Sequence, residues 1–590
     1  MKTITLKKQL LLVALIFFCG VAPSFADDDT SMTLNVEAGT LSSLIPASKM
    51  YKITELKLSG ELNVEDLKVI RRMGACRKSS KDEWYDGHLQ HLDISDAEFV
   101  GDGIFVCYFK NGSYGPRNFT DRKYLFAGMK SLQTIELPNS MKEIDGSLFW
   151  ECSNLVSLTL PSELTTIGVN SLADCPNLMS IKIDKNNPYY CSDGAILFNK
   201  DKSKIVLAKK TLDAYAVPSS VTQIQSYAFA GCNSLIYLIL PSGLTQIEGG
   251  TFYGCSSLKS LTLPSGVTQI GDQAFWNCSS LYSLTLPSGV TQIGNYAFYG
   301  CSSLQSLTLP SGVTQIGEMT FFRCSSLYSL TLPSGVTQIG ESAFSGCRSL
   351  KSLTLPSSVT QIGNHAFSGC SSLKSLTLPS GVTQIGEWTF SGCSSLYSLT
   401  LPSGVTHIGN CAFCRCSSLY SLTLPSGVTQ IGNSAFYGCS SLKSLTLPSG
   451  VTQIGEMTFY RCSSLASLTL PSSLREISVD AFLECENIET IYSYMPDPLP
   501  LYFEKNVMDK AILYVPKGSY QNYVLADYWK EFNNIKEFDP ETASINNTQS
   551  ADNTKELSRY AVNGQRLATP TKGLNIVRYS DGTVKKVMEK

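Results

Sequence analysis

The chain has 590 residues, with 47 basic and 49 acidic side chains, a formal net charge of −2, four histidines and 20 cysteines. A weakly charged, near-neutral chain lacks the clustered basic surface that a nucleic-acid-binding protein uses. So few histidines argue against histidine-based catalysis and against a histidine-rich metal site. We therefore expect no nucleic-acid partner, no metal and no cofactor.

The first 26 residues have the pattern of a secretory signal peptide. Lys2, Lys7 and Lys8 precede the apolar run Leu10–Cys19, and Ser24-Phe25-Ala26 fits a small-residue cleavage site. The run is shorter than a bilayer-spanning helix, and no later segment has about 18 consecutive apolar residues. The pattern predicts a signal peptide over 1–26, an exported mature chain and no transmembrane segment.

Residues 27–131 are expected to form a cap at the front of the following repeats. Asn63 is a candidate N-cap for a helix whose apolar face contains Val64, Leu67, Ile70 and Met73. The segment Leu89–Ile94 then has the pattern of a first, degenerate repeat strand. Such a cap is needed because the open end of a stack exposes unpaired strands.

The middle of the chain repeats every 23 residues. Leu258–Ser280 is one unit, eleven units follow one another from Leu235 to Asn487, and two divergent units cover 132–177. One interrupted unit, 178–234, separates the two groups. A period of this length with Leu at positions 1, 4 and 6 is typical of a leucine-rich repeat. We predict a β-rich leucine-rich repeat solenoid over 132–487, its coils forming a curved stack.

Each unit is expected to form one coil. Alternation places Leu261 and Leu263 inward, with the hydroxyl side chains between them outward. Pro264 ends the strand, and Val267 and Ile270 return to the core on a second short strand. A tight bend at Gly271 then leads to Ala274, Phe275 and Cys278, which pack the outer side, with a helical turn expected there.

The end of the chain is divided into three parts. Residues 488–538 are expected to close the stack with a final strand at Ala511–Pro516 and an aromatic-rich helix through Tyr528–Phe532. Residues 539–557 are polar and predict a linker. Residues 558–590 predict a small β module with two hairpins, which turn at Asn563-Gly564 and at Asp581-Gly582.

The repeat consensus, Leu-x-x-Leu-x-Leu-Pro-x-x-Val-x-x-Ile-Gly-x-x-Ala-Phe-x-x-Cys, resembles the BspA-like leucine-rich repeat surface proteins. The interrupted unit shares the resemblance through Asn187-Pro188-Tyr189, Ser192–Phe198 and a hairpin at Asn199–Asp201. The back cap shares it through Leu513–Ser519 and Tyr528–Lys530. The resemblance implies a non-enzymatic surface solenoid, often an adhesin for host extracellular-matrix or serum glycoproteins or for other microbes.

The C-terminal module resembles the sorting domain of proteins exported by the bacterial type IX secretion route. The resemblance rests on Asn563, Gly564, Asp581 and Gly582 together with the strand-like Val584–Val587. It implies that the C-terminus engages secretion machinery. It also implies that the protein is secreted or held at the outer surface of a Gram-negative cell.

Most of the cysteines recur at one position of the repeat. They could serve as metal ligands or disulfide partners in an oxidising compartment, but equivalent Cβ vectors in stacked coils run parallel, which disfavours bridges. We expect small buried side chains beside Phe instead. The regular part of this structural ladder is Cys232, Cys255, Cys278, Cys301, Cys324, Cys347, Cys370, Cys393, Cys416, Cys439, Cys462 and Cys485, and Cys152 and Cys175 precede it.

Three further sets of residues are candidates for chemical sites. Cys411, Cys414 and Cys416 have the spacing of a zinc or iron–sulfur string, but no fourth ligand is suggested beyond His407. The redox states of Cys411 and Cys414 stay open, as does a disulfide between Cys76 and Cys107.

The third set is His88 and His91 with Asp93 and Asp96, which could suggest a catalytic or metal cluster. We interpret these residues as surface decoration, because their spacing does not define a general acid/base pair. No nucleophile elbow, phosphate loop or His-Glu-x-x-His motif is present. The sequence therefore predicts a protein that is not an enzyme.

The variable second position of the repeat is the candidate ligand-binding site. Tyr and Lys dominate it, and aligned Tyr and Lys side chains would form a multivalent surface. The alternative is drift among duplicated units. The candidate residues are Lys259, Tyr282, Tyr328, Lys351, Lys374, Tyr397, Tyr420 and Lys443.

We therefore predict a cell-surface protein that adheres to host or microbial surface proteins and glycoproteins. The alternatives are glycan capture and a structural surface scaffold.

Overall fold

The computed structural model describes residues 30–78, 83–108, 114–118, 124–144, 147–169, 172, 175–540, 556–561, 566–567, 569, 573–579 and 584–589. The predicted signal peptide, the four turn residues of the sorting-like module and most of the predicted linker lie outside these residues. The chain divides into two units, Met1–Gly289 and Val290–Lys590, which are described separately. In the described ranges, no helix has both the length and the apolar character needed to cross a bilayer.

The first unit begins with a cap whose strands continue the sheet of the repeats. Strands β1, β2 and β3 are parallel neighbours, and β3 pairs with β6 (Thr134–Glu136), the first strand of the first repeat. The expected strand near Leu89–Ile94 is present as β3, and β1 and β2 precede it in the sheet. The cap elements are β1 (Ser31–Val36), α2 (Leu41–Leu44), β2 (Glu55–Leu62), α3 (Val64–Met73), β3 (His91–Phe99), β4 (Ile104–Tyr108) and β5 (Tyr114–Asn118).

Helix α3 begins at the predicted cap residue. Asn63 Oδ1 accepts hydrogen bonds from the backbone N–H groups of Glu65 and Asp66, and Asp66 Oδ2 accepts one from the N–H of Asn63. This reciprocal pair satisfies N–H groups that have no partner inside the helix. The apolar side chains of the expected face are buried, so the helix prediction is confirmed.

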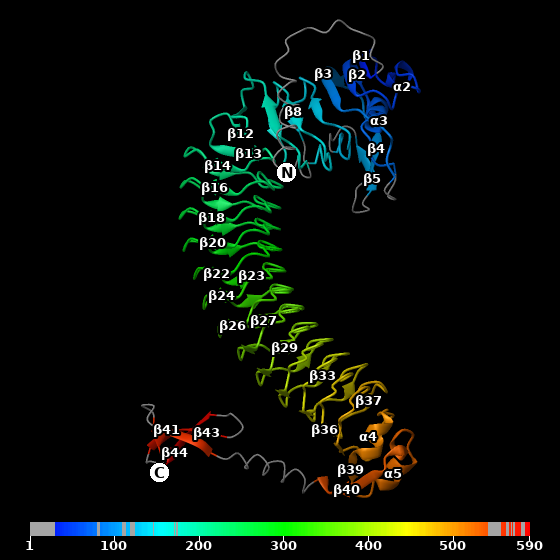
Figure 1. The fold of residues 1–590 in the computed structure, drawn as a ribbon, viewed down its shortest axis with the longest axis vertical. Helices are drawn as coiled ribbons and strands as arrows, with labels where there is room; N and C mark the ends of the chain where they lie inside the picture. Colours follow the sequence, from blue (N-terminus) through cyan, green and yellow to red (C-terminus); the bar gives the residue numbers. More distant parts are fainter. Residues whose placement is uncertain are drawn as a thin grey trace, which may run out of the picture. The chain divides into compact units, whose positions relative to one another are not determined.

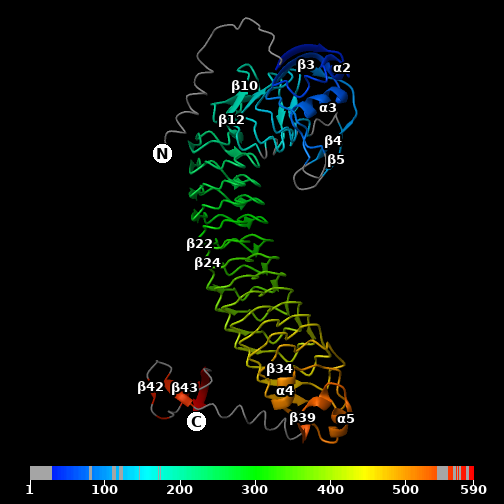
Figure 2. The same cartoon turned by 45° about the vertical axis from the view of Figure 1, so that its right-hand side comes forward.

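Each coil of the first unit has two short strands, and the coils stack in parallel (Figures 1 and 2). The first strands are β6, β8 (Ser157–Leu160), β10 (Ser180–Ile183), β14 (Ala214–Ala216), β16 (Tyr237–Ile239), β18 (Ser260–Thr262) and β20 (Ser283–Thr285). The second strands are β7 (Glu143–Ile144), β9 (Thr166–Ile167), β15 (Gln223–Ile224), β17 (Gln246–Ile247) and β19 (Gln269–Ile270).

The interrupted unit contains one enlarged coil. After β10, strands β11 (Tyr190–Ser192), β12 (Ile196–Asn199) and β13 (Lys204–Ala208) form an antiparallel meander. The predicted hairpin at Asn199–Asp201 is confirmed by the pairing of β12 with β13. Strand β13 then pairs in parallel with β15, so it takes the place of a second strand in the stack.

The second unit repeats the same coil with little variation. Its first strands are β22 (Ser306–Thr308), β24 (Ser329–Thr331), β26 (Ser352–Thr354), β28 (Ser375–Thr377), β30 (Ser398–Thr400), β32 (Ser421–Thr423), β34 (Ser444–Thr446), β36 (Ser467–Leu470) and β38 (Thr490–Ser493). Its second strands are β21 (Gln292–Ile293), β23 (Gln315–Ile316), β25 (Gln338–Ile339), β27 (Gln361–Ile362), β29 (Gln384–Ile385), β31 (His407–Ile408), β33 (Gln430–Ile431), β35 (Gln453–Ile454) and β37 (Glu476–Ile477).

A row of stacked phenylalanines fills the core of the second unit. Phe344, for example, lies with its ring centroid 5.6 Å from that of Phe321 and 5.4 Å from that of Phe367, with nearly parallel planes. The row ends on Phe503, whose ring meets Trp529 and Phe532 edge to face. The back cap therefore closes the aromatic row as well as the sheet.

The back cap contains one strand that was not predicted. The expected strand and aromatic helical segment are present, but β40 follows them and pairs with β39, so β40 is the final strand of the sheet. The cap elements are α4 (Lys505–Lys510), β39 (Ile512–Pro516), α5 (Tyr520–Leu525), the 3₁₀-helix η1 (Trp529–Glu531) and β40 (Asn534–Phe538).

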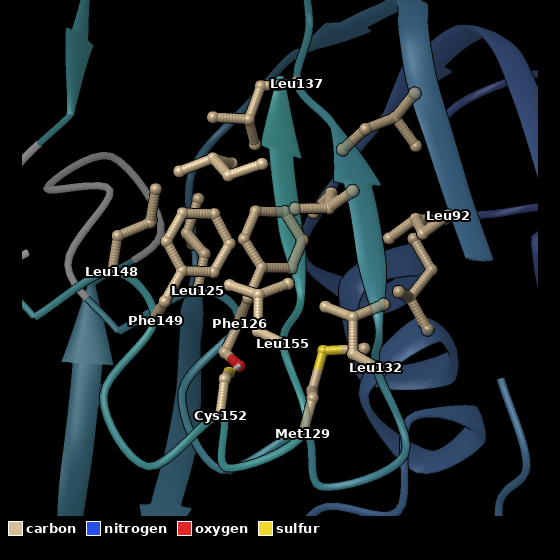
Figure 3. Close-up of a cluster of buried hydrophobic side chains, with 14 of the residues drawn as sticks. Leu92, Leu125, Phe126, Met129, Leu132, Leu137, Leu148, Phe149, Cys152 and Leu155 are labelled. Carbon is tan, nitrogen blue, oxygen red and sulfur yellow. Dashed lines mark hydrogen bonds between the residues drawn. The ribbon is translucent and has the colours of Figure 1, made fainter. Parts of the chain in front are cut away.

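The core of the first unit joins the cap to the repeats. Figure 3 shows Leu92 of β3 together with Leu132, Leu155, Phe126 and Phe149, all pointing into one cluster. The rings of Phe126 and Phe149 stack with centroids 5.6 Å apart. Cap and coils thus share one apolar core.

The segment between the second strand of one coil and the first Leu of the next is the turn arm, residues 271–280 in the coil that starts at Leu258. The expected helical turn does not form there, because Gln273 and Asn277 have left-handed backbone with φ of 58° and 54°. At Gly271 the structure shows a further role beside the predicted bend. A Cβ atom at this position would lie 2.5 Å from the backbone N of Gly249 in the preceding coil, so the glycine permits close stacking.

The C-terminal module is a separate four-stranded antiparallel sheet in the order β42-β41-β43-β44. Its strands are β41 (Glu556–Ala561), β42 (Arg566–Leu567), β43 (Gly573–Tyr579) and β44 (Val584–Glu589). The pairs β41–β42 and β43–β44 are the strands expected on either side of the two predicted turns.

The cysteine ladder is buried and, among the described cysteines, none forms a disulfide. The thiol of each repeat cysteine points at the backbone of the preceding coil. Cys370 Sγ donates to the carbonyl oxygen of Phe344 at 3.2 Å, and Cys347 Sγ donates to that of Phe321 at the same distance. The side chain therefore fills a small apolar space, as predicted, and its thiol also donates a hydrogen bond that links two coils, which was not predicted.

We predict that truncation of the aromatic row is costly and truncation of the outer face is not. Phe344→Ala should lower the free energy of unfolding by about 3–5 kcal/mol, because a fully buried ring leaves a cavity between two coils. Tyr328→Ser, at an exposed position, should change the free energy by less than about 0.5 kcal/mol. Urea unfolding of both variants measures the difference, and the reverse order would contradict the assignment of inward and outward positions.

The ladder also predicts alkaline sensitivity. Burial raises the pKa of Cys370 from 9.0 to about 12, so the stability that this group contributes is complete below about pH 9 and is lost as the pH rises toward 12. Each pH unit above the unfolded pKa costs about 1.4 kcal/mol. Cys370→Ala should therefore lose stability less steeply than the unchanged chain when urea unfolding is compared between about pH 8 and about pH 10.5. Thr377→Ala, on the exposed face, should keep the original slope; equal slopes for all three proteins would refute the prediction.

Candidate binding surface

The eight predicted ligand-binding residues all lie exposed, immediately before a first strand. Two of them belong to the first unit, where Tyr282 N donates to Lys259 O at 3.0 Å. The others occupy six successive coils of the second unit. The structure therefore brings together Tyr328, Lys351, Lys374, Tyr397, Tyr420 and Lys443, which we name the Tyr–Lys row.

The row is held by backbone hydrogen bonds from coil to coil. Tyr397 N donates to Lys374 O at 3.2 Å, Tyr420 N donates to Tyr397 O at 3.0 Å, and Lys443 N donates to Tyr420 O at 3.2 Å. Since each side chain projects from a backbone fixed in this way, successive side chains are separated by one inter-strand spacing, roughly 4.8 Å. The Tyr397 and Tyr420 rings stack with centroids 5.5 Å apart and planes 9° apart.

The surface around the row is polar but uncharged. The first strands beside it present Ser and Thr hydroxyl groups, as in Ser398 and Thr400 of β30. Among the residues that the structure describes, the ion pairs do not include any of the three lysines of the row. The row is therefore a narrow strip of cationic and aromatic groups on a hydroxyl-rich face.

A second set of aromatic pairs lies on the turn arms, directly after the buried Phe of some coils. Tyr299 stacks on Phe322 with centroids 4.8 Å apart, and Tyr437 stacks on Tyr460 at 5.3 Å. Tyr460 is tied further to its neighbours, because its hydroxyl donates to Glu484 Oε1 at 2.5 Å, which raises the pKa of Tyr460. Glu484 also pairs with Arg461 at 2.7 Å. The arm pair Tyr437–Tyr460 thus has a side-chain hydrogen bond to a carboxylate in addition to its ring stacking.

The candidate metal-binding and catalytic residues make local contacts within the fold. Cys416 Sγ donates to the Phe390 carbonyl oxygen as an ordinary member of the ladder, whereas Cys414 is buried and Cys411 half-buried. In the described part of the chain, no group of three or more His, Cys, Asp and Glu side chains could hold a metal ion. Cys76 is buried and free; the side chain of Cys107, its suggested partner, lies outside the described residues.

The candidate His and Asp cluster is dispersed among local contacts. His91 Nδ1 lies 2.8 Å from Thr134 Oγ1, and His88 Nδ1 lies 2.8 Å from the Tyr51 carbonyl oxygen. Asp93 and Asp96 both pair with Lys57, at 2.8 and 3.3 Å. The two acids thus share one cation on the outer face of the cap sheet and do not form an acid/base pair.

Comparison with known proteins gives a consistent picture of the repeats. The family described as "BspA type Leucine rich repeat region" matches in six copies, over residues 120–197, 203–328, 318–443 and 394–496. No curated protein matches the chain.

Three of the similar solved structures are described as leucine-rich proteins. A leucine rich cell surface protein from Faecalibacterium prausnitzii A2-165 is 31% identical, covers 52% of this chain and 96% of its own, and has a TM-score of 0.40. A leucine-rich repeat protein from Bacteroides ovatus ATCC 8483 is 24% identical, with 75% and 100% coverage and a TM-score of 0.35. The T. pallidum leucine rich repeat protein is 27% identical, with 44% and 90% coverage and a TM-score of 0.24. Because the matches to the family description span more than half of the sequence, the chain belongs to the BspA-type leucine-rich repeat family.

Proposed function

We propose that this chain is an exported surface protein that binds host extracellular-matrix or serum glycoproteins, or the surface proteins of other microbes, through the Tyr–Lys row. The observation that carries the proposal is the alignment of exposed Tyr and Lys side chains on six successive coils. Tyr397 and Tyr420, at its centre, are 56% and 43% exposed although they are large aromatic side chains. Large exposed aromatics that lie together are characteristic of binding surfaces.

The chemistry of the row favours a protein partner with acidic groups. Two adjacent tyrosines offer flat apolar area together with hydroxyl groups, and the lysines on either side offer charge. Each single contact of this kind is weak at an exposed site. Repetition at one strand spacing lets several contacts form at once, so that avidity supplies the affinity.

Export is part of the same proposal. The predicted signal peptide 1–26 and the resemblance of the C-terminal module to a type IX sorting domain support delivery to the outer surface of a Gram-negative cell. The module would then engage the secretion machinery through its hairpins. Binding would need no cofactor and no covalent chemistry, in keeping with the absence of recognised catalytic motifs from the sequence.

Glycan capture is the alternative function, and the hydroxyl-rich strands beside the row favour it. A long face of Ser and Thr offers both donors and acceptors to sugar hydroxyl groups. A structural surface scaffold would use neither the row nor the strands for recognition. The three functions differ in what they bind, so one binding assay separates them.

We predict that the double variant Tyr397→Ser/Tyr420→Ser weakens binding at least tenfold while leaving the fold intact. The full chain is immobilised and presented with purified extracellular-matrix proteins, serum glycoproteins, mucins and free oligosaccharides. Retention should fall with added salt, because the lysines contribute. Surface plasmon resonance gives the affinity, and circular dichroism checks the fold.

The matched control is Tyr437→Ser/Tyr460→Ser, which removes a stacked tyrosine pair from the turn arms of the same unit. It should bind as the unchanged chain does. Equal loss in both variants, or no loss in the first, would reject the row as the binding site. Binding that free oligosaccharide abolishes would establish glycan capture, and binding to nothing in the panel would favour the scaffold.

A further inference from the structure

We propose that the first unit contains a second, separate binding site: a cavity that takes an acidic sugar, with its carboxylate held by Lys210, Lys130 and Arg77. The cavity has a volume of about 810 Å³, within the range of small-ligand sites. Its walls come from the front cap and from the turn arms of several coils of the same unit. It shares no residue with the Tyr–Lys row, so the two proposals stand independently.

The cavity lies where one turn arm is short. An ordinary arm has ten residues between the Ile of the second strand and the first Leu of the next coil, as in 271–280. The arm that follows Ile205 of β13 has only six, 206–211, before Leu212. It lacks the buried Phe and the Cys of a normal arm. The neighbouring arms therefore have no aromatic partner at this coil, and Cys232 Sγ donates to Lys209 O at 3.5 Å instead of to a Phe carbonyl.

Lys210 lies next to the last residue of this short arm and is the central cation of the site. It is only 3% exposed, and its ammonium group donates to the carbonyl oxygen of Ala230. Among the described residues, the ion pairs do not include Lys210. A buried ammonium group without a carboxylate partner is costly unless an anion approaches it. Two of its three N–H groups remain to donate to such an anion.

Two more cations line the cavity and come from the front cap. Lys130 Nζ lies 3.3 Å from the centre of the Trp84 ring, and the Arg77 guanidinium carbon lies 4.9 Å from it. The indole thus positions both charges at the wall. The acidic residue in the lining is Glu151, so that three cations face one carboxylate and the cavity favours an anion.

The remaining walls suit a sugar ring. Trp150, Tyr227 and Tyr253 supply aromatic surface, and the Tyr227 hydroxyl donates to Gln273 Oε1 at 2.8 Å. Flat apolar faces of pyranose rings pack on such side chains. The amide groups of Asn233 and Gln273 offer donors and acceptors for sugar hydroxyl groups. Cations, aromatic faces and amides together point to a carboxylated sugar at the end of a glycan.

The test titrates the full chain with sialyllactose, with lactose and with benzoate, and records both calorimetric heat and tryptophan fluorescence. Sialyllactose should bind and change the fluorescence, because Trp84 and Trp150 line the cavity. Lactose should bind at least tenfold more weakly, since it lacks the carboxylate. Equal binding of benzoate and sialyllactose would overturn sugar recognition, and equal binding of lactose would overturn the role of the carboxylate. Failure of sialyllactose to bind would overturn the proposal as a whole.

Lys210→Met removes the buried charge and should weaken sialyllactose binding at least tenfold. If this variant does not fold, Lys130→Met, at an exposed position of the cavity lining, gives the same test with a smaller expected loss of about threefold. Lys182→Met, on an exposed strand outside the cavity, is the matched control and should bind normally. Unchanged binding in both cavity variants would refute the site. The variant Tyr397→Ser/Tyr420→Ser should keep full sialyllactose binding, which separates this proposal from that of the row.

Discussion

Close stacking of equivalent coils is the constraint on which the rest of the structure depends. Every coil must offer the next coil the same backbone groups at the same positions, because hydrogen bonds join equivalent residues of neighbouring coils. In the second unit, for example, Leu353 pairs with Leu376, and Ile339 with Ile362. Three side-chain choices follow directly. Phe stacks on Phe, Cys donates to the carbonyl oxygen of the preceding Phe, and a glycine after the second strand lets two backbones approach without a Cβ between them. One coil alone could satisfy none of these contacts, so stability arises only in the stack.

Much of this arrangement could be predicted from the sequence, because a strand's alternation and a fixed period leave few alternatives. The two strands per coil, the buried Phe and Cys positions, the N-cap at Asn63 and the hairpin after β12 all follow from local patterns. The thiol hydrogen bond could not be predicted, since it depends on the offset between the Cys of one coil and the Phe of the coil before it. The stacking role of Gly271 could not be predicted for the same reason. A glycine suggests a turn locally, but the backbone that Gly271 approaches is that of Gly249, which is 22 positions away.

The two caps were predicted as segments, but the strands β1, β2 and β40 within them were not predicted. Strands β1 and β2 lack the repeat consensus, yet they extend the same parallel sheet as β3, because sheet pairing requires backbone geometry and not a particular sequence. The same holds for β40 at the other end. The candidate row was predicted from its variability, and its exposure follows from its place next to the strand. What only the structure adds is that Tyr397 and Tyr420 stack face to face.

The two proposed sites show how a regular stack gains the capacity to recognise other molecules. At the second position of the repeat, a side chain points outward from the core, so its identity can change without disturbing the stack; recognition there comes from repetition. At the interrupted coil the stack itself changes, and the shortened arm removes a Phe and a Cys that its neighbours would otherwise contact. The missing volume is lined by side chains, such as Lys210, that have no equivalent in the regular coils. The sequence contains the short arm of this second site, with six residues in place of ten. The arm can be recognised only when β13 is known to pair with β15, because that pairing defines where the arm begins.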